Sequence, residues 1–419
     1  MRTWHRNFDI GLLLTWAGLI CVGLVAIYSS TRGGAQEYLL DSVRLNFNRQ
    51  LIWSVICAIG IGVALLLPVR FYLTIAYPFY GLTLLLLVVA LFAGYEVNGA
   101  RSWLRIGPVQ FQVSEFAKIG TLLAVAQLAA TRRVGISPLR TSMYMILLVL
   151  VPVVLIVLQN DTGTALVYLA IIPMLLYWSG LSLAHVLLLI APAVSGYLII
   201  VYPSAAYVFL AIFVVALLAR RRGAVSVGIA LLTNGGVIAL MTYALESVLK
   251  PHHVARLLSF TNPEAIEYRY TVGFHLVQSK AAIGSGGLWG KGFMEGTQTQ
   301  GAYVPEQTTD FVFSVIGEEF GFLGSLVVLL LFGFLLMRLV MIAGQIKHPF
   351  GNTFVVGVAA FYLVHIFLNI GMTTGMLPVI GIPLPFISYG GSALITESMM
   401  LAIVLNLYMR RDDFSIYGY

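Results

Sequence analysis

The chain has 419 residues, of which 59% are apolar and only 10% are charged. Soluble domains usually carry about 25% charged residues, so this composition excludes an ordinary soluble protein. A formal net charge of +7 would suggest nucleic-acid binding in a soluble chain. In a membrane protein it is explained by cytoplasmic Arg and Lys that fix topology, and we expect no nucleic-acid partner.

Apolar runs of about 20 residues, the length that crosses a bilayer core, recur from end to end. They predict an all-α polytopic membrane protein with about twelve spans. The predicted spans are residues 9–29, 49–67, 72–94, 114–131, 142–158, 164–180, 185–201, 204–219, 225–246, 311–337, 352–371 and 390–409. The first run follows basic residues but is long and has no A-x-A site, which favours an uncleaved helix over a signal peptide.

Basic residues in the short loops fall mostly on one side of this alternation. With the N-terminus inside, the inner loops carry Arg2, Arg6, Arg70, Arg132, Arg133, Arg140, Arg220, Arg221, Arg222, Arg338, Lys347, Arg410 and Arg411, and the short outer loops carry Arg32, Arg44, Arg49, Arg101 and Arg105. Short cytoplasmic loops are enriched in Lys and Arg. We therefore predict that both termini are cytoplasmic and that the long loop 247–310 lies outside.

The outer loop before the fourth predicted span contains a turn signal, two arginines and an aromatic residue. Arg101 could bind phosphate oxygens through its planar fork. Trp103 could stack on a sugar, although a place in the aromatic belt explains it equally well. Glu115 and Lys118 open the span on one helix face. They are either an interfacial pair that snorkels or a charged pair that lines a polar cavity.

The long outer loop includes a glycine-rich segment at 284–296. So many glycines exclude an ordinary helix there. The segment is either a flexible tether or a place where the backbone closely approaches a ligand.

Asp310 stands where an apolar helix is predicted to begin. It could be the N-cap of that helix, and Thr308 or Thr309 could serve as well. A carboxylate at this place could also act as a base on a substrate at the membrane surface. Glu318 and Glu319 lie deeper, where ionised groups are costly and are expected to be paired.

The last outer loop, residues 372–392, contains three prolines and several glycines before the final span. It is predicted to be a re-entrant, non-helical element buried in protein or lining a cavity, or the glycines act only as caps or hinges. We find no metal-binding histidine spacing, no Walker loop and no G-x-S-x-G or H-E-x-x-H motif. Cys21 and Cys57 lie in apolar runs and predict no disulfide.

Several segments resemble, in the same order, the motifs of one family of cell-wall proteins. They are NGARSW followed by FQVSEFAK, QNDTGTAL, LKPHHVARLLSF, QSKAAIGSGGLWGKG, VPEQTTDFVFSVIGEEFGFLG and NIGMTTGMLPVIGIPLPFISYGGS. From about Asn98 to the C-terminus, apart from part of 180–245, the chain resembles the SEDS family (shape, elongation, division and sporulation). Its VPEQ and GIPLPFISYGG sequences are closer to the elongation branch than to the division branch.

The resemblance implies a single membrane domain over residues 1–419 with about ten core spans and an extra helix pair within 185–246. It makes Asp310 the catalytic residue, although Thr308 replaces a histidine that is usual in the family. The other residues that the family motifs suggest are the substrate-binding candidates Arg101, Trp103, Glu115, Lys118, Lys291, Glu306 and Ser388, and the supporting intramembrane acids Asp161, Glu318 and Glu319.

The activity implied is that of a peptidoglycan glycosyltransferase, which polymerises lipid II at the outer face of the cytoplasmic membrane. Asp310 would deprotonate a sugar hydroxyl of the acceptor. Arg101, Lys118 and Lys291 would stabilise the leaving diphosphate, alone or with a divalent cation such as magnesium or manganese. The expected partners are lipid II, the growing glycan strand, a class B penicillin-binding protein transpeptidase and other membrane proteins of the elongation complex.

Two other functions fit part of the pattern. A flippase for lipid-linked precursors would also use intramembrane charges and broken helices. Its polar groups should be accessible from both leaflets, whereas these motifs gather on one side. A non-catalytic scaffold of the cell-wall machinery would tolerate replacement of Asp310.

Overall fold

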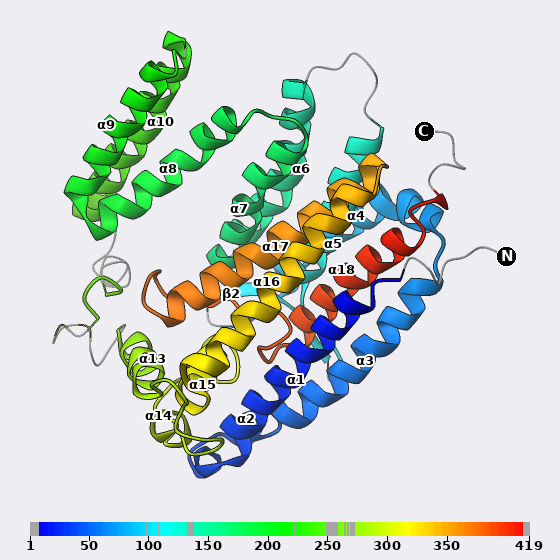
Figure 1. The fold of residues 1–419 in the computed structure, drawn as a ribbon, viewed down its shortest axis with the longest axis vertical. Helices are drawn as coiled ribbons and strands as arrows, with labels where there is room; N and C mark the ends of the chain where they lie inside the picture. Colours follow the sequence, from blue (N-terminus) through cyan, green and yellow to red (C-terminus); the bar gives the residue numbers. More distant parts are fainter. Residues whose placement is uncertain are drawn as a thin grey trace.

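The computed structural model describes residues 8–97, 99–107, 109–131, 138–221, 223–248, 259–263, 265, 268 and 273–413. Within them, ten helices are long and apolar enough to cross a membrane, and two shorter helices are also apolar (Figure 1). The long helices are α1 (Ile10–Arg32), α3 (Asn46–Leu66), α4 (Val69–Ala93), α5 (Val113–Ala130), α6 (Pro138–Leu158), α8 (Leu183–Val201), α10 (Ala224–Tyr243), α16 (Gly321–Gln345), α17 (Pro349–Thr373) and α18 (Gly391–Met409); the shorter ones are α7 (Thr162–Trp178) and α9 (Pro203–Ala219). Each predicted span falls on one of them, so the polytopic helical prediction is confirmed.

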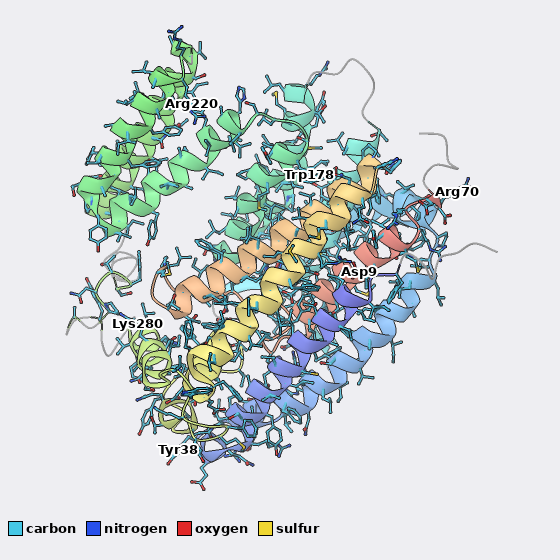
Figure 2. The ribbon with its side chains drawn as sticks, viewed as in Figure 1. Asp9, Tyr38, Arg70, Trp178, Arg220 and Lys280 are labelled. Atoms are coloured by element: carbon cyan, nitrogen blue, oxygen red, sulfur yellow. The ribbon has the colours of Figure 1, made fainter. Side chains whose placement is uncertain are left out.

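The helices alternate in direction, as the sidedness prediction requires. In Figure 2, Asp9, Arg70 and Arg220 lie toward one end of the bundle, and Tyr38 and Lys280 lie toward the other. The end that carries Lys280 is called the outer end below. Its assignment to the outside of the cell stays a prediction.

One predicted span is two helices. The run 311–337 begins in α15 (Val312–Glu319), turns at Phe320, and continues as α16. Gly321 adopts a left-handed φ of 66° at this turn, and a Cβ there would lie 2.3 Å from the backbone nitrogen of Gly290. Only glycine tolerates both the conformation and the contact. Glu318 and Glu319 therefore end a short helix at the outer end, so their placement inside a span was wrong.

The loop before α5 forms strands, which the sequence analysis did not predict. β1 (Tyr95–Val97), β2 (Ala100–Ile106) and β3 (Val109–Gln112) make an antiparallel sheet in that order, and Trp103 pairs with Gln112 across it. The sheet packs against α4, α5 and α18. The remaining short elements of the described chain are η2 (Gly34–Glu37), α2 (Asp41–Arg44), η3 (Ala244–Val248), α13 (Phe274–Ser285) and α14 (Thr297–Gln300).

Burial divides the spans into a centre and an edge. About three quarters of the apolar windows of α5, α17 and α18 are buried (72%, 78% and 78%), against 17% for α10. Figure 1 shows α9 and α10 side by side at the edge of the molecule, next to α8. These three helices share small clusters of their own, such as Leu188, Leu217 and Ala230. The runs in which an extra helix pair was predicted thus lie away from the centre.

Candidate active site

Asp310 precedes α15, and its carboxylate makes no hydrogen bond or ion pair with any residue that the structure describes. The N-cap of α15 is Phe311, which gives no side-chain cap. Thr308 bonds to α3 instead, and the Thr309 hydroxyl donates to Glu306 Oε2 at 2.8 Å. The prediction that Asp310 or a neighbouring threonine caps the helix is therefore wrong. The lone pairs of the carboxylate are available for chemistry.

The Asp310 carboxylate is partly buried under the last outer loop. Its Oδ2 lies 3.4 Å from the position that a Cβ would take on Gly381, which has a φ of 78°. Burial and, second, the negative charge of Glu306 raise the pKa of Asp310 to about 7. A general base works best when its pKa is near the working pH, so this carboxylate is suited to take a proton near neutrality.

The last outer loop, residues 374–390, is called the proline loop below. It has no helix or strand and much of it is buried, which confirms the prediction of a non-helical element enclosed by protein. The Ser388 hydroxyl donates to Thr309 O at 2.6 Å and accepts from Leu384 N at 2.8 Å. The structure thus uses Ser388, a substrate-binding candidate, to tie the loop to the segment that carries Asp310.

Glu306 and His275 are the titratable residues close to Asp310 and Phe311. Glu306 is exposed and has a φ of 51°. The His275 ring lies against the Phe311 ring, with 5.9 Å between centroids. Burial lowers the pKa of His275, and the charge of Glu306 opposes that shift. Glu306 is thus the carboxylate that influences both neighbouring titratable groups.

Glu115 and Lys118 form a buried ion pair. Lys118 Nζ lies 2.7 Å from Glu115 Oε1, and the two residues are only 1% and 3% exposed. Lys118 Nζ is also 2.9 Å from His365 Nε2. The snorkelling interpretation is wrong because neither group reaches the surface.

Arg101 and Trp103 lie on β2. Arg101 Nε is 3.4 Å from Glu96 Oε2, and both side chains are more than half exposed. Exposed pairs of this kind contribute little, so an anionic ligand can displace Glu96 from Arg101. Trp103 is half-buried in the sheet.

Asp161 has a structural place. Its Oδ1 accepts from Thr164 N at 3.1 Å, which caps α7. Its Oδ2 accepts from Gln112 Nε2 at 2.8 Å. Asp161 therefore joins the start of α7 to the end of β3. It was predicted to be an intramembrane acid, but it lies at the N-cap of α7 and not inside the helix.

Glu318 is fully buried and saturated with donors. They are Ser285, Lys291, Thr297, Gln298 and Thr299. Burial alone would raise the pKa of Glu318, but these hydrogen bonds outweigh it and lower the pKa. Lys291 Nζ is 2.7 Å from Glu318 Oε1, so the charge proposed for a diphosphate is already paired. Glu319 is bound to Ser29 at 2.6 Å and to Gln300 at 2.9 Å.

The glycine-rich segment packs against the protein backbone. A Cβ on Gly286 would lie 2.0 Å from Gly317 O, and one on Gly290 would lie 2.1 Å from Glu319 O. The close approach that the glycines permit is therefore to the end of α15. The flexible-tether interpretation is therefore wrong for these positions, and an approach of this segment to a ligand stays a prediction.

Four residues near these groups were not singled out from the sequence. His365 and Asn369 stand one turn apart on α17, and Glu397 is on α18; all three are nearly fully buried. The cost of a polar group inside a span was the signal that could have found them. Lys280 on α13 is exposed, and no carboxylate among the described residues pairs with it.

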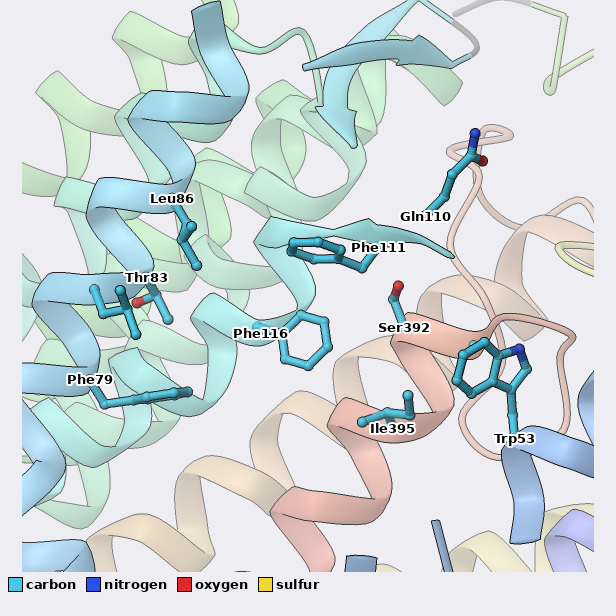
Figure 3. A pocket seen from close by; sticks show the side chains of 11 residues that line it. Trp53, Phe79, Thr83, Leu86, Gln110, Phe111, Phe116, Ser392 and Ile395 are labelled. Atoms are coloured by element: carbon cyan, nitrogen blue, oxygen red, sulfur yellow. The ribbon is translucent and has the colours of Figure 1, made fainter. Parts of the chain in front are cut away.

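A cavity of about 350 Å³ lies between α3, α4, α5, β3 and α18. Figure 3 shows that aromatic and aliphatic side chains line it, with Ser392 at the start of α18 and Gln110 on β3 near one end. Its walls suit a hydrocarbon chain. Among the described residues, no group of three or more His, Cys, Asp or Glu could hold a metal ion.

Comparisons with known proteins agree on one family. The family model for FtsW, RodA and SpoVE, described as a cell cycle protein, matches residues 10–207 and 202–413. The chain is 32% identical to the peptidoglycan glycosyltransferase RodA of Treponema pallidum, over 97% of this chain and 98% of that protein. It is 33% identical to the peptidoglycan glycosyltransferase MrdB of Escherichia coli, over 83% and 82% of the two chains.

Solved structures show the same fold. A chain of a peptidoglycan synthase complex, described for its coordination of polymerization and crosslinking, matches with a TM-score of 0.72 and 29% identity, over 96% of this chain and 98% of that one. The rod shape determining protein RodA of Thermus thermophilus matches with a TM-score of 0.62 and 28% identity, over 96% and 97%.

Proposed function

The chain belongs to the family of FtsW, RodA and SpoVE, and from that premise we propose that Asp310 is the general base of a lipid II polymerase. The protein is a polytopic membrane enzyme, a peptidoglycan glycosyltransferase of the RodA type. The observation that carries the proposed role of Asp310 is its unpartnered carboxylate, whose pKa is raised to about 7.

In the proposed reaction, Asp310 takes the proton of an acceptor sugar hydroxyl. The resulting nucleophile attacks the anomeric carbon of a lipid-linked donor from the face opposite the leaving group. The glycosidic bond forms as the bond to the diphosphate breaks, so the anomeric centre inverts and the polyprenyl diphosphate leaves with its electron pair. One base is sufficient because the diphosphate is a good leaving group.

Positive charge is needed where the diphosphate departs. Three cations were first suggested for this role. Lys118 and Lys291 are bound to the buried carboxylates of Glu115 and Glu318, whereas Arg101 is more than half exposed and its partner Glu96 is exposed too. Lys280 is a further exposed cation. Its Cδ lies 3.2 Å from the position that a Cβ would take on Gly375, in the proline loop that covers Asp310. We therefore assign Arg101 and Lys280 to the diphosphate.

A divalent cation fits this site only in company with the substrate. Magnesium commonly binds one or two carboxylates together with substrate phosphates and water. The free oxygens of Asp310 and the exposed Glu306 could supply the protein part of such a site, and magnesium or manganese would then add positive charge beside the diphosphate.

The lipid tail is proposed to lie in the apolar cavity beside α18, so that the substrate enters sideways from the membrane. The catalytic end is proposed to face outward from the cytoplasmic membrane, with both chain termini cytoplasmic. A class B penicillin-binding protein transpeptidase is the proposed partner, which the similarity to a chain of a peptidoglycan synthase complex supports.

The test is polymerisation of lipid II by purified protein, with and without the transpeptidase. D310A should form few or no glycan strands, because it removes the proposed base. Asp41→Ala is the matched control, since Asp41 is an outer-end carboxylate that is 96% exposed on α2, and it should polymerise like the wild type. Normal strand formation by D310A would exclude Asp310 as the base. Absence of strands with the wild-type protein, with and without the transpeptidase, would favour a scaffold or, if vesicles showed lipid II transport, a flippase.

A further inference from the structure

Side chains of α17 and α18, the two helices that flank the proline loop, bind the buried side of this loop. Pro378, Pro383 and Pro385 lack a backbone donor, and the loop forms no helix or strand. Where the loop is buried, its carbonyls and remaining N–H groups must therefore find partners in the protein.

Asn369 of α17 provides the first contact. It is fully buried, and its Nδ2 donates to Ile382 O at 2.7 Å and to Asp310 O at 2.9 Å. One amide group thus binds the proline loop and the backbone of the proposed base at the same time, which fixes their separation.

His365 provides the second contact, one helical turn deeper. Its Nδ1 is 3.3 Å from Pro383 O, and its Nε2 is 2.9 Å from Lys118 Nζ. An ammonium group can only donate, so Nε2 accepts and Nδ1 carries the proton that is donated to Pro383. The buried pair of Glu115 and Lys118 therefore fixes the tautomer that binds the loop.

Glu397 of α18 provides the third contact. Its Oε2 accepts from Phe386 N at 3.0 Å, and Phe386 has a left-handed φ of 63°. A bulky residue adopts that conformation only when its surroundings impose it. The Tyr362 ring, 5.3 Å from that of Phe386, holds the same residue from the side.

We propose that His365, Asn369 and Glu397 are positioning residues, which together hold the proline loop in register with Asp310. Gly381 of this loop closes over the Asp310 carboxylate, and Ser388 binds the backbone next to it. Displacement of the loop by about 1 Å would move the base relative to the acceptor hydroxyl, which can cost about 100-fold in rate. All three side chains are nearly fully buried, so they act through the loop and the Asp310 segment that they bind.

The experiment compares paired substitutions in purified enzyme, with kcat and KM for lipid II measured separately. In H365N the amide takes the place of Nδ1 and keeps the donor to Pro383, whereas H365Q keeps the acceptor to Lys118 and loses that donor. E397Q keeps an acceptor for Phe386 N, whereas E397L removes it. Thr396→Val is the control on the same helix, because the buried Thr396 hydroxyl has no partner among the described residues.

We expect kcat to fall by up to about 100-fold in H365Q and E397L with little change in KM, and much of the loss to be restored in H365N and E397Q. A control for folding is the thermal midpoint of each variant in detergent. Equal kcat in H365N and H365Q, or in E397L and the wild type, would overturn the inference. So would losses that follow the thermal midpoint alone.

Because the inference rests on the proposed role of Asp310, D310A is measured in parallel. An inactive D310A with fully active H365Q and E397L would overturn the positioning inference and leave the base in place. An active D310A would overturn the proposed base first, whatever the other variants do.

Discussion

Two carboxylates at the two ends of α15 have opposite surroundings. Asp310 precedes the helix, has no partner among the described residues, and has its pKa raised to about 7 by burial and by Glu306. Glu318 lies near the end of the helix, is saturated with donors, and has its pKa lowered by them. Hydrogen-bond satisfaction, rather than burial or residue type, separates a carboxylate kept for chemistry from one that holds the structure together.

The largest effect is expected at Asp310, the carboxylate that has no hydrogen-bond partner among the described residues. Asp310→Asn should reduce polymerisation by about 10²–10⁴-fold, the usual contribution of a general base. It should leave the thermal midpoint unchanged or raise it, because it removes a buried charge without a partner. Strand formation and thermal unfolding of the same preparation check both points. A large fall in the midpoint would mean that Asp310 is structural.

Substitution of Glu318, the carboxylate with many donors, should lower the stability of the protein and leave the polymerisation rate unchanged. Glu318→Leu would leave Lys291 and two backbone N–H groups without their acceptor, which should cost about 3 kcal/mol of stability. The thermal midpoint measures this loss. The folded fraction should keep its polymerisation rate, and a midpoint equal to that of the wild type would contradict the structural role.

The pH dependence of the reaction sharpens the comparison further. The rate should rise with pH as Asp310 loses its proton, with a midpoint near 7. Glu306→Gln removes a neighbouring negative charge, which makes the ionised Asp310 less costly and lowers its pKa. The midpoint of kcat/KM against pH should therefore move to lower pH, by up to about one unit. A shift to higher pH would mean that Glu306 does not act on Asp310 through its charge.

The smallest effect is expected at Lys291. Its side chain is 24% exposed, so Lys291→Met should cost about 1 kcal/mol or less after solvent screening. The polymerisation rate should stay close to that of the wild type. Lys280→Met is the matched comparison, and it should slow the reaction through the diphosphate. The reverse result would return Lys291 to the role first suggested for it.

Much of the fold was predictable because bilayer physics leaves few choices. Apolar length alone located each span, and the proline loop followed from its three prolines. The break at Gly321 was not predicted, because an apolar run that continues across a turn looks the same as one helix. The break depends on the contact between Gly321 and Gly290, and hydrophobic periodicity cannot report a contact between residues so far apart in the sequence.

The site was predictable from its motifs but not from its contacts. Asp310 stood out, yet the residues alone could not separate a helix cap from a base, since an acid at the start of a helix can serve as either. The family motifs suggested Lys291 and Ser388 as substrate-binding candidates. Their partners, Glu318 and Thr309, come from other segments, so the sequence did not show that both are bound within the protein. His365 and Glu397 were passed over because a single polar residue in an apolar run gives no pairing signal.

The tight packing of the glycine-rich segment also turns several apolar side chains toward the surface of the protein. Because Gly286 and Gly290 lie flat on the end of α15, the residues between and after them are pushed outward, and Leu288, Trp289 and Phe293 are 54%, 77% and 47% exposed. Aromatic side chains prefer the headgroup level of a bilayer. We therefore expect these three side chains to lie at the headgroup level and to set the height of Asp310 relative to the lipid phosphates.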